Sequence, residues 1–327
     1  MEIKKRRIYL HKGKVLGRND MYFSSNRIKI FAGLLSLFTA GFLGAIKFWV
    51  GFEQDSLAVL ASALDSGLDF LTSSVNLYAL YQAAKPADSD HRYGYGKAEA
   101  IAGLFQSLLV AASGGWILIR AGEHFLHPKS EIPEISSFYV MFISLALTGA
   151  LILFQRSVVR KTGSLLVAAD SLHYVSDLLG NLLVLLSVAV AMNTGWGWVD
   201  PLAGALVSLY LLKGAWSIFR NSTDILMDRD LSYEYRDSIV RVVESRAPQV
   251  LGYHDLRTRS AGERRFLEFH LEMPKNLTLE DSHKILDSIL DELKEEFPYT
   301  EVLIHPDPVD VSQSGRTLLD KEAPRFY

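Results

Sequence analysis

The stretch SLAVLASALDSGLDFLTSS, residues 56–74, has the apolar composition of a membrane-spanning helix but contains two acids, Asp65 and Asp69. Residues four apart on a helix lie on the same face, so both carboxylates leave this helix on one side. A charged side chain in the middle of a membrane helix costs about 2.5–3.5 kcal/mol on insertion scales. Two acids on one face of such a helix therefore indicate a functional site inside the membrane.

The whole first part of the chain has the pattern of a multi-span membrane protein. Crossing a bilayer takes about 20 predominantly apolar residues per helix. Six blocks joined by short links reach that length: residues 28–51, 56–84, 100–126, 135–157, 164–193 and 200–220. Lys and Arg gather in the N-terminal arm and in the links after the second and fourth blocks, whereas the alternate links contain only Lys129. Since positive loops stay in the cytoplasm, we expect six helices with both termini cytoplasmic.

The chain after residue 225 has the composition of a soluble domain. From Arg229 onward, 20 Asp and Glu stand against 14 Lys and Arg, whereas the first 228 residues hold 17 acids and 20 bases. Its hydrophobic periodicity predicts the order helix, strand, strand, helix, strand, which is typical of a small ferredoxin-like α+β sandwich. We expect a basic arm over 1–27, a membrane domain over 28–225, this αββαβ domain over 226–310 and a disordered tail over 311–327. This charge balance does not support a nucleic-acid-binding function.

The fifth apolar block, like the second, carries two ionisable side chains four residues apart. In the stretch DSLHYVSD, His173 and Asp177 are four apart, and Asp170 precedes them by one turn. Lys47 and Lys213 lie nearer the ends of their helices, where their side chains can extend toward the membrane surface. We therefore expect no Lys or Arg charge at the depth of the acids. A buried hydrogen-bond network is one explanation of these acids. Carboxylates without a cationic partner repel one another, however, and a divalent cation between the two helices removes that repulsion.

The donor types narrow the choice of cation. The chain has no cysteine, so a metal must be held by His, Asp or Glu. Carboxylates with an imidazole suit tetrahedral Zn²⁺, whereas Mg²⁺ and Ca²⁺ prefer oxygen ligands. Ligand type does not exclude Fe²⁺, Mn²⁺, Co²⁺ or Cd²⁺. Because such ligands must lose protons to bind metal, metal and protons compete for one site, which is the chemistry of a metal/proton antiporter.

Several motifs, taken together, resemble the cation diffusion facilitator family, most closely its bacterial zinc and iron efflux branch. They are ALDSGLD, PADSDHRYGYGKAEA, DSLHYVSD and the series HDLRTR, FHLEM and IHPDP, which occur in order between about residues 28 and 310. The resemblance implies a homodimeric six-helix exporter in the bacterial inner membrane, driven by the proton gradient through alternating access, with a cytoplasmic ferredoxin-like domain. It implies a transport site made of Asp65, Asp69, His173 and Asp177, and leaves Asp170 a packing or hydrogen-bonding role.

The same resemblance implies three further features. A loop site should use Asp88, His91 and a third position that is Tyr95 here; because Tyr is a poor zinc ligand, we expect this site to be weak or lost. A binuclear zinc site at the dimer interface is implied for a set of five residues: His254, His270, His283, His305 and Asp307. Strand alternation in RRFLEFHLEM independently places His270 on the polar face, whereas His283 borders the apolar stripe of its helix. Lys97 and Asp228 match the family's salt bridge between the helices and the soluble domain.

Three alternatives remain open from the sequence. The first keeps the mechanism but takes Fe²⁺, Mn²⁺ or Cd²⁺ as main cargo. The second is an intramembrane zinc enzyme that activates water. Against it, the four polar positions all serve as ligands, which leaves no open coordination place, and no His-Glu-x-x-His pattern occurs. The third is a metal sensor that does not transport, which predicts that replacing Asp69 leaves function intact.

Overall fold

The computed structural model describes residues 18–53, 57–126, 135–194, 198–246, 248–297 and 299–310. The chain divides into two compact units. The helical unit comprises Asp20–Leu226, and the α+β unit comprises the described residues from Met227 onward. The tail expected over 311–327 and the first 17 residues of the expected arm lie outside the described residues.

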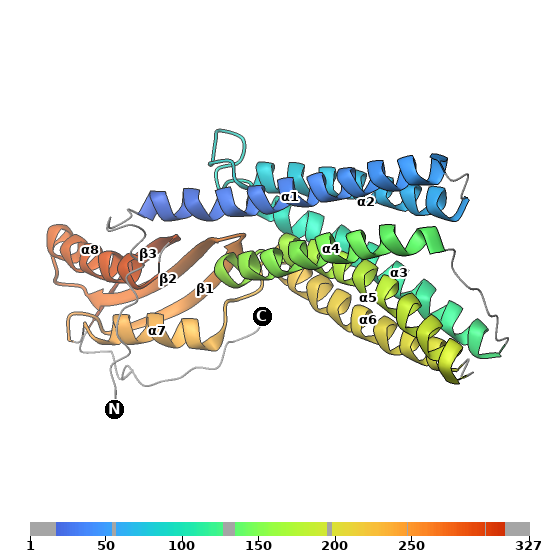
Figure 1. Ribbon diagram of the computed structural model, residues 1–327. Helices are drawn as coiled ribbons and strands as arrows, with labels where there is room; N and C mark the ends of the chain where they lie inside the picture. The colour runs from blue at the N-terminus through green and yellow to red at the C-terminus, as the bar shows by residue number, and fades with distance from the viewer. Residues whose placement is uncertain are drawn as a thin grey trace, which may run out of the picture. The chain divides into compact units, whose positions relative to one another are not determined.

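Six long helices make up the helical unit over the described residues (Figure 1). They are α1 (Arg18–Glu53), α2 (Leu57–Ala83), α3 (Lys97–Leu126), α4 (Ile135–Thr162), α5 (Leu165–Thr194) and α6 (Val199–Leu226). Each of the six apolar blocks in the sequence corresponds to one of these helices. The predicted fold class is confirmed for this part of the chain.

Four of the helices contain described stretches that are long and apolar enough to cross a membrane: Ser25–Glu53, Lys97–Leu126, Phe142–Thr162 and Pro201–Leu226. These stretches belong to α1, α3, α4 and α6. The remaining two helices, α2 and α5, carry the Asp and His side chains noted in the sequence. On average α5 is the most apolar of the six described helices, and α2 is more apolar than α1, α4 and α6, so the candidate ligands lie in strongly apolar helices.

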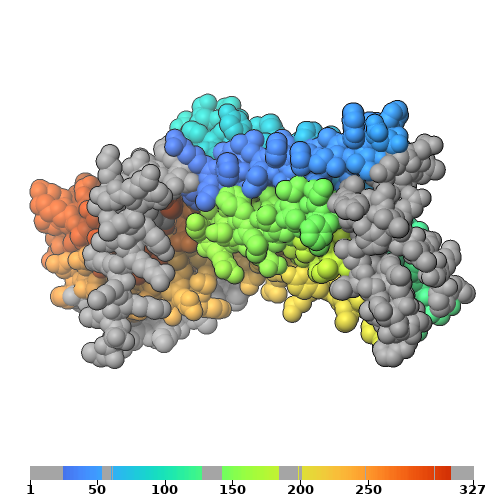
Figure 2. All heavy atoms as spheres, in the orientation of Figure 1, coloured from blue at the N-terminus to red at the C-terminus, as the bar shows by residue number. Residues whose placement is uncertain are grey.

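Small residues and aromatic contacts hold the helices together. A Cβ atom on Gly114 of α3 would lie 3.4 Å from Leu212 of α6, and Ser208 of α6 donates a hydrogen bond to the Gly114 carbonyl at 2.5 Å. This close approach is typical of membrane helices with Gly at the interface. The helices α1 and α4 run side by side, as Figures 1 and 2 show, and the rings of Phe31 and Phe154 meet edge to face with centroids 5.7 Å apart.

The α+β unit has the predicted order of elements. It consists of α7 (Tyr233–Glu244), β1 (Gly252–Ala261), β2 (Arg264–Pro274), α8 (Leu279–Glu296) and β3 (Thr300–Val309). The sheet order is β1-β2-β3, with β1 antiparallel and β3 parallel to β2. The hydroxyl of Thr278 caps α8 by accepting a hydrogen bond from the Asp281 amide at 3.1 Å. The ferredoxin-like αββαβ prediction is confirmed.

One apolar core connects the two short helices to one face of the sheet. Ile239 of α7 and Ile289 and Leu293 of α8 are buried with Phe269 and Leu271 of β2. Because successive side chains of a strand point to opposite faces, His270 between Phe269 and Leu271 points away from this core. The side of the sheet away from α7 and α8 is therefore the side on which polar ligands can gather.

Candidate metal sites

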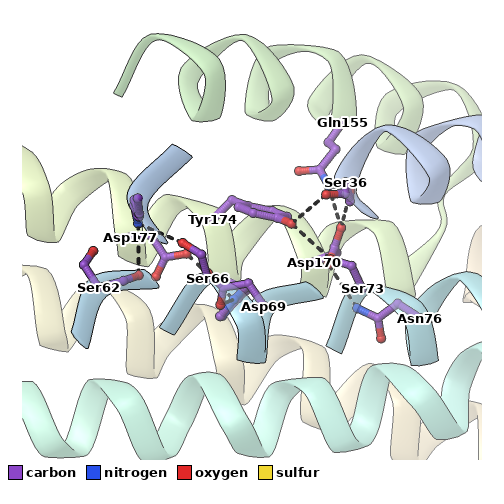
Figure 3. Close-up of polar contacts among 12 residues, drawn as sticks. Ser36, Ser62, Ser66, Asp69, Ser73, Asn76, Gln155, Asp170, Tyr174 and Asp177 are labelled. Atoms are coloured by element: carbon purple, nitrogen blue, oxygen red, sulfur yellow. Dashed lines mark hydrogen bonds and ion pairs between the residues drawn. The ribbon is translucent and has the colours of Figure 1, made fainter. Parts of the chain in front are cut away.

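Two helices that are far apart in sequence place acidic and imidazole groups together inside the helical unit. The Nε2 atom of His173 on α5 lies 2.9 Å from Oδ1 of Asp69 on α2 and 3.7 Å from Oδ2 of Asp177. One ligand atom from each of the three residues lies within 4.8 Å of the others. Asp69 and Asp177 approach each other from the two helices in Figure 3.

The spacing of these atoms suits a tetrahedral metal ion. Zn²⁺ binds His nitrogen and carboxylate oxygen at about 2.0–2.2 Å, so neighbouring ligand atoms around it lie about 3.4 Å apart. The observed separations from Nε2 of His173, 2.9 Å and 3.7 Å, bracket that value. The side chains are partly accessible, with Asp177 the most open at 39%. The types of donor and these two separations are therefore compatible with a small dication.

Asp65 is the one expected transport ligand that stands apart. It lies one turn before Asp69 on the same side of α2, but its side chain is exposed. Among the described residues of the helical unit, the group of possible ligands within 4.8 Å of one another contains Asp69, His173 and Asp177 and not Asp65. The structure therefore brings together three of the four expected ligands.

Asp170 lies one turn before His173 and belongs to a separate buried network. Its Oδ2 atom accepts hydrogen bonds from Ser36 of α1 and Gln155 of α4, both at 2.7 Å. Its Oδ1 atom accepts one from Asn76 of α2 at 3.0 Å. The carboxyl group is thus connected to three other helices, and Figure 3 shows this arrangement. The network anchors α5 directly beside the candidate metal ligands.

Lys47 overturns one expectation from the sequence. Its amino group donates hydrogen bonds to the hydroxyl of Ser66 at 2.8 Å and to the carbonyl of Ser62 at 3.5 Å, both on α2. It also interacts electrostatically with the carboxylates of Asp69 and Asp177. The expectation that Lys47 snorkels away from the acids was wrong, because its flexible four-carbon stem reaches across to α2 instead.

The loop between α2 and α3 brings Asp88, His91 and Tyr95 together. The Asp88 carboxylate accepts hydrogen bonds from the Tyr95 hydroxyl at 2.7 Å and from the His91 amide at 2.8 Å. The hydrogen bond from Tyr95, followed by that from His91, lowers the pKa of the Asp88 carboxyl. The rings of His91 and Tyr95 pack with centroids 4.2 Å apart. Tyr95 therefore acts as a hydrogen-bond donor to the carboxylate that a metal ion would need.

A second cluster forms on the α+β unit, where three strands each contribute a group. His254 of β1 is paired with His270 of β2, which is paired with His305 of β3. Asp307 lies at the centre: its Oδ2 atom is 2.9 Å from Nδ1 of His270 and 3.1 Å from Nε2 of His254. The Nε2 atom of His305 lies 3.4 Å from the other carboxylate oxygen. The sheet register thus assembles four of the five expected ligands.

The electrostatics of this cluster favour an ionised carboxylate. Partial burial raises the pKa of the Asp307 carboxyl, but the hydrogen bond from His270 and the nearby charges of His270, His305 and His254 outweigh it. The net result is a lowered pKa for Asp307. Because metal binding requires a deprotonated carboxylate, the cluster keeps its central ligand ready for a cation.

His283 lies away from this cluster. It is exposed near the start of α8, and its Nε2 atom is 3.6 Å from Asp287 of the same helix. Helix α8 packs on the face of the sheet opposite to His270. A single chain therefore does not bring His283 to the other four groups.

Lys97 and Asp228 belong to different units, and each has a contact within its own unit. The amino group of Lys97 donates to the Leu226 carbonyl at 3.4 Å. Asp228 has a positive φ of 54° and lies 3.5 Å from Arg259. The salt bridge between Lys97 and Asp228 stays a prediction.

Comparison with known proteins agrees with a membrane protein that handles cations. Residues 33–227 match the family model described as the cation efflux transmembrane domain, and residues 231–309 match the model for the cytoplasmic domain of cation efflux proteins. The first match alone covers more than half of the chain. The chain belongs to the cation efflux, or cation diffusion facilitator, family.

Individual relatives align over most of their length. A cation-efflux pump FieF from Shewanella oneidensis is 40% identical over 280 residues, which cover 86% of this chain and 94% of the relative. Protein p34 of Rickettsia rickettsii is 36% identical over 89% of this chain and 95% of its own length. A FieF pump of Klebsiella pneumoniae is 35% identical over 88% of this chain and 95% of its own length. The chain is thus a membrane transporter for the efflux of metal cations, and the enzyme alternative is set aside.

Proposed function

We propose that this transporter exports Zn²⁺ from the cytosol in exchange for protons, as a homodimer in the bacterial inner membrane with both termini cytoplasmic. The observation that carries the proposal is the meeting of Asp69, His173 and Asp177 between two membrane helices. Zn²⁺ is the preferred cargo because an imidazole with carboxylates suits it better than Mg²⁺ or Ca²⁺. Fe²⁺, Mn²⁺ and Cd²⁺ are the cargoes to compare with it.

Asp65 completes the proposed transport site as the fourth ligand. It lies one helical turn before Asp69 on the same side of α2, so a change of side-chain rotamer or a small turn of the helix brings it toward the same ion. Its exposure gives it access to an approaching cation. We assign it to capture and release of the cargo, with Asp69, His173 and Asp177 as the central group.

Proton exchange follows from the chemistry of the ligands. Each carboxylate and the imidazole must be deprotonated to bind the dication. When the site opens to the cytosol, metal displaces protons; when it opens outward, protons recover the ligands and the metal leaves. Alternating access of the bundle, which the family resemblance implies, connects these two exchanges to opposite sides of the membrane.

A resident Zn²⁺ would be held on the α+β unit by His254, His270, His305 and Asp307. These donors suit zinc by type and lie within a few ångströms of one another. When bound, the ion would join all three strands and fix the ligand-bearing face of the sheet. We propose that this face belongs to the dimer interface and that His283 takes part there. No resident metal is proposed for Asp88 and His91, and the Lys97–Asp228 pair is proposed as a hinge.

The experiment is metal uptake into proteoliposomes under an imposed pH gradient, with Zn²⁺, Fe²⁺, Mn²⁺ and Cd²⁺ tested in turn. We expect Zn²⁺ flux that requires the gradient and disappears in Asp69→Ala and Asp177→Ala, with both variants folded. Asp224→Ala, an acid on α6 outside the ligand group, is the matched control and should retain flux. Zinc flux that ignores the pH gradient would exclude the proton exchange, and flux retained in both site variants would exclude the site.

A further inference from the structure

Lys47 of α1 is a lysine bound to α2, the helix that carries Asp69 of the transport site. Its amino group is held by the Ser66 hydroxyl at 2.8 Å, and Ser66 is only 2% exposed. Ser66 follows Asp65 directly and precedes Asp69 by three residues. The dashed lines at Ser62 and Ser66 in Figure 3 mark these bonds. Lys47 thus places a positive charge beside the ligands without being a ligand.

The charge of Lys47 acts on the same carboxylates that we assign to the cargo. It interacts electrostatically with Asp69, Asp177 and Asp65. The lysine also repels the dication, because both are positive.

We propose that Lys47 is a fixed positive charge near the site that weakens its hold on the dication, so that the ion is released at the end of each cycle. This inference rests on the proposed function, because it takes Asp69, His173 and Asp177 as the cargo ligands. Lys47 acts through the field at the site and through the position of α2. It is therefore a residue that sets affinity and turnover, and it does not coordinate the ion.

A purely structural role for Lys47 predicts the opposite result. If the lysine only fastens α1 to α2, its loss loosens the helix that carries Asp69 and weakens metal binding. If it acts as a fixed positive charge, its loss removes a repulsion and strengthens metal binding. The sign of the change in affinity therefore separates the two roles.

The test compares Lys47→Met, which keeps the length of the side chain but removes its charge, with Lys47→Arg, which keeps the charge. Zinc flux is measured in proteoliposomes of the full-length protein. Zn²⁺ is added on the alkaline side of the membrane, where competition from protons for the ligands is weakest. We expect Lys47→Met to lower KM about tenfold and to lower the maximal rate, because a positive charge near a dication opposes its binding. Lys47→Arg should have a KM and a maximal rate close to those of the parent protein.

Two controls complete the experiment. Lys213→Met removes an exposed lysine of α6 and should change neither quantity. Equilibrium Zn²⁺ binding, measured in a His270→Ala, Asp307→Ala background that lacks the α+β cluster, should show the same tightening in Lys47→Met. An unchanged or raised KM in folded Lys47→Met, with Asp69→Ala inactive, overturns this inference alone. Full flux in Asp69→Ala overturns the proposed site itself.

Discussion

At the scale of single residues, Asp170 shows how a membrane protein keeps a carboxyl group buried. The group is 4% exposed, and Ser36, Asn76 and Gln155 all donate hydrogen bonds to it from neutral side chains. Donors of this kind stabilise a charge without bringing another charge into the bilayer. The arrangement holds α5 in place one turn from His173.

Replacing Asp170 by Asn should destabilise the helical unit by about 1–3 kcal/mol. The new side-chain NH₂ group would face one of the groups that now donate to Asp170, and that donor would lose its acceptor. The thermal unfolding midpoint in detergent is the measurement. Asp65→Asn changes an exposed acid of the neighbouring helix in the same chemical way and should leave the midpoint unchanged. Equal midpoints for Asp170→Asn and the parent protein would show that the network contributes little.

The α+β cluster makes a prediction about metal and stability. A ligand that binds only the folded state stabilises it by about 2.7 kcal/mol at a concentration 100 times its Kd. Zn²⁺ should therefore raise the unfolding temperature of the parent protein, and EDTA should reverse the rise. In His270→Ala the response to Zn²⁺ should become smaller, leaving the part due to the transport site, because Asp307 loses its closest imidazole, at 2.9 Å.

Glu268→Ala is the matched control for that measurement. Glu268 is an exposed residue of the same strand, two positions before His270, and it lies outside the cluster. It should respond to Zn²⁺ like the parent protein. An undiminished response in His270→Ala would show that the metal binds elsewhere.

At the scale of elements, the loop between α2 and α3 holds Tyr95 at the position where the family resemblance implies a metal ligand. The Tyr95 hydroxyl holds the Asp88 carboxylate at 2.7 Å, and its own pKa is raised by that hydrogen bond. The neighbouring His91 ring packs against Tyr95 in a tilted arrangement. The third position of this loop therefore engages the Asp88 carboxylate by a hydrogen bond.

Tyr95→His should give this loop a metal site. The new imidazole would join Asp88 and His91, and each folded chain should bind one more Zn²⁺ than the parent protein. Inductively coupled plasma analysis of the dialysed protein measures this number. Tyr95→Phe removes the hydroxyl without adding a ligand and should bind no additional ion. An unchanged zinc content in Tyr95→His would show that the loop geometry does not suit a metal.

The sequence predicted the elements and missed some of the contacts between them, for physical reasons. The i, i+4 acids and the strand alternation around His270 follow from local periodicity, which a single sequence contains. The position of Lys47 depends on its rotamer, because its stem can extend toward the helix end or across to α2. A signal was nevertheless present: Lys47 and Ser62 both lie within three helical turns of the short link between α1 and α2.

Two ligand expectations depended on more than local pattern. Four histidine and aspartate positions of the α+β unit meet because β1, β2 and β3 are in register. His283 was placed with them by resemblance alone, and the single chain leaves it exposed on α8. Asp65 shares a helix face with Asp69, but helix periodicity does not decide which rotamer an exposed acid adopts.

At the scale of the whole molecule, the chain combines a cation efflux transmembrane domain with the cytoplasmic domain of the same family. In the proposed mechanism the helical unit carries the ion, and the metal cluster on the α+β unit joins two chains. The dimer should therefore weaken when that cluster is emptied. Sedimentation of the full-length protein in detergent should show monomer increasing on addition of EDTA, and Zn²⁺ should restore the dimer. A dimer that is indifferent to both would separate the cluster from assembly.

The central claim is that a dication lies between α2 and α5 on the ligands Asp69, His173 and Asp177. Zinc-edge X-ray absorption of the full-length protein, in the His270→Ala, Asp307→Ala background, tests it most directly. We predict one bound Zn²⁺ per chain with imidazole nitrogen and carboxylate oxygen at about 2.0–2.2 Å, and loss of the imidazole signal in His173→Ala. Absence of bound zinc in that background, or an imidazole signal that survives in His173→Ala, would contradict the account.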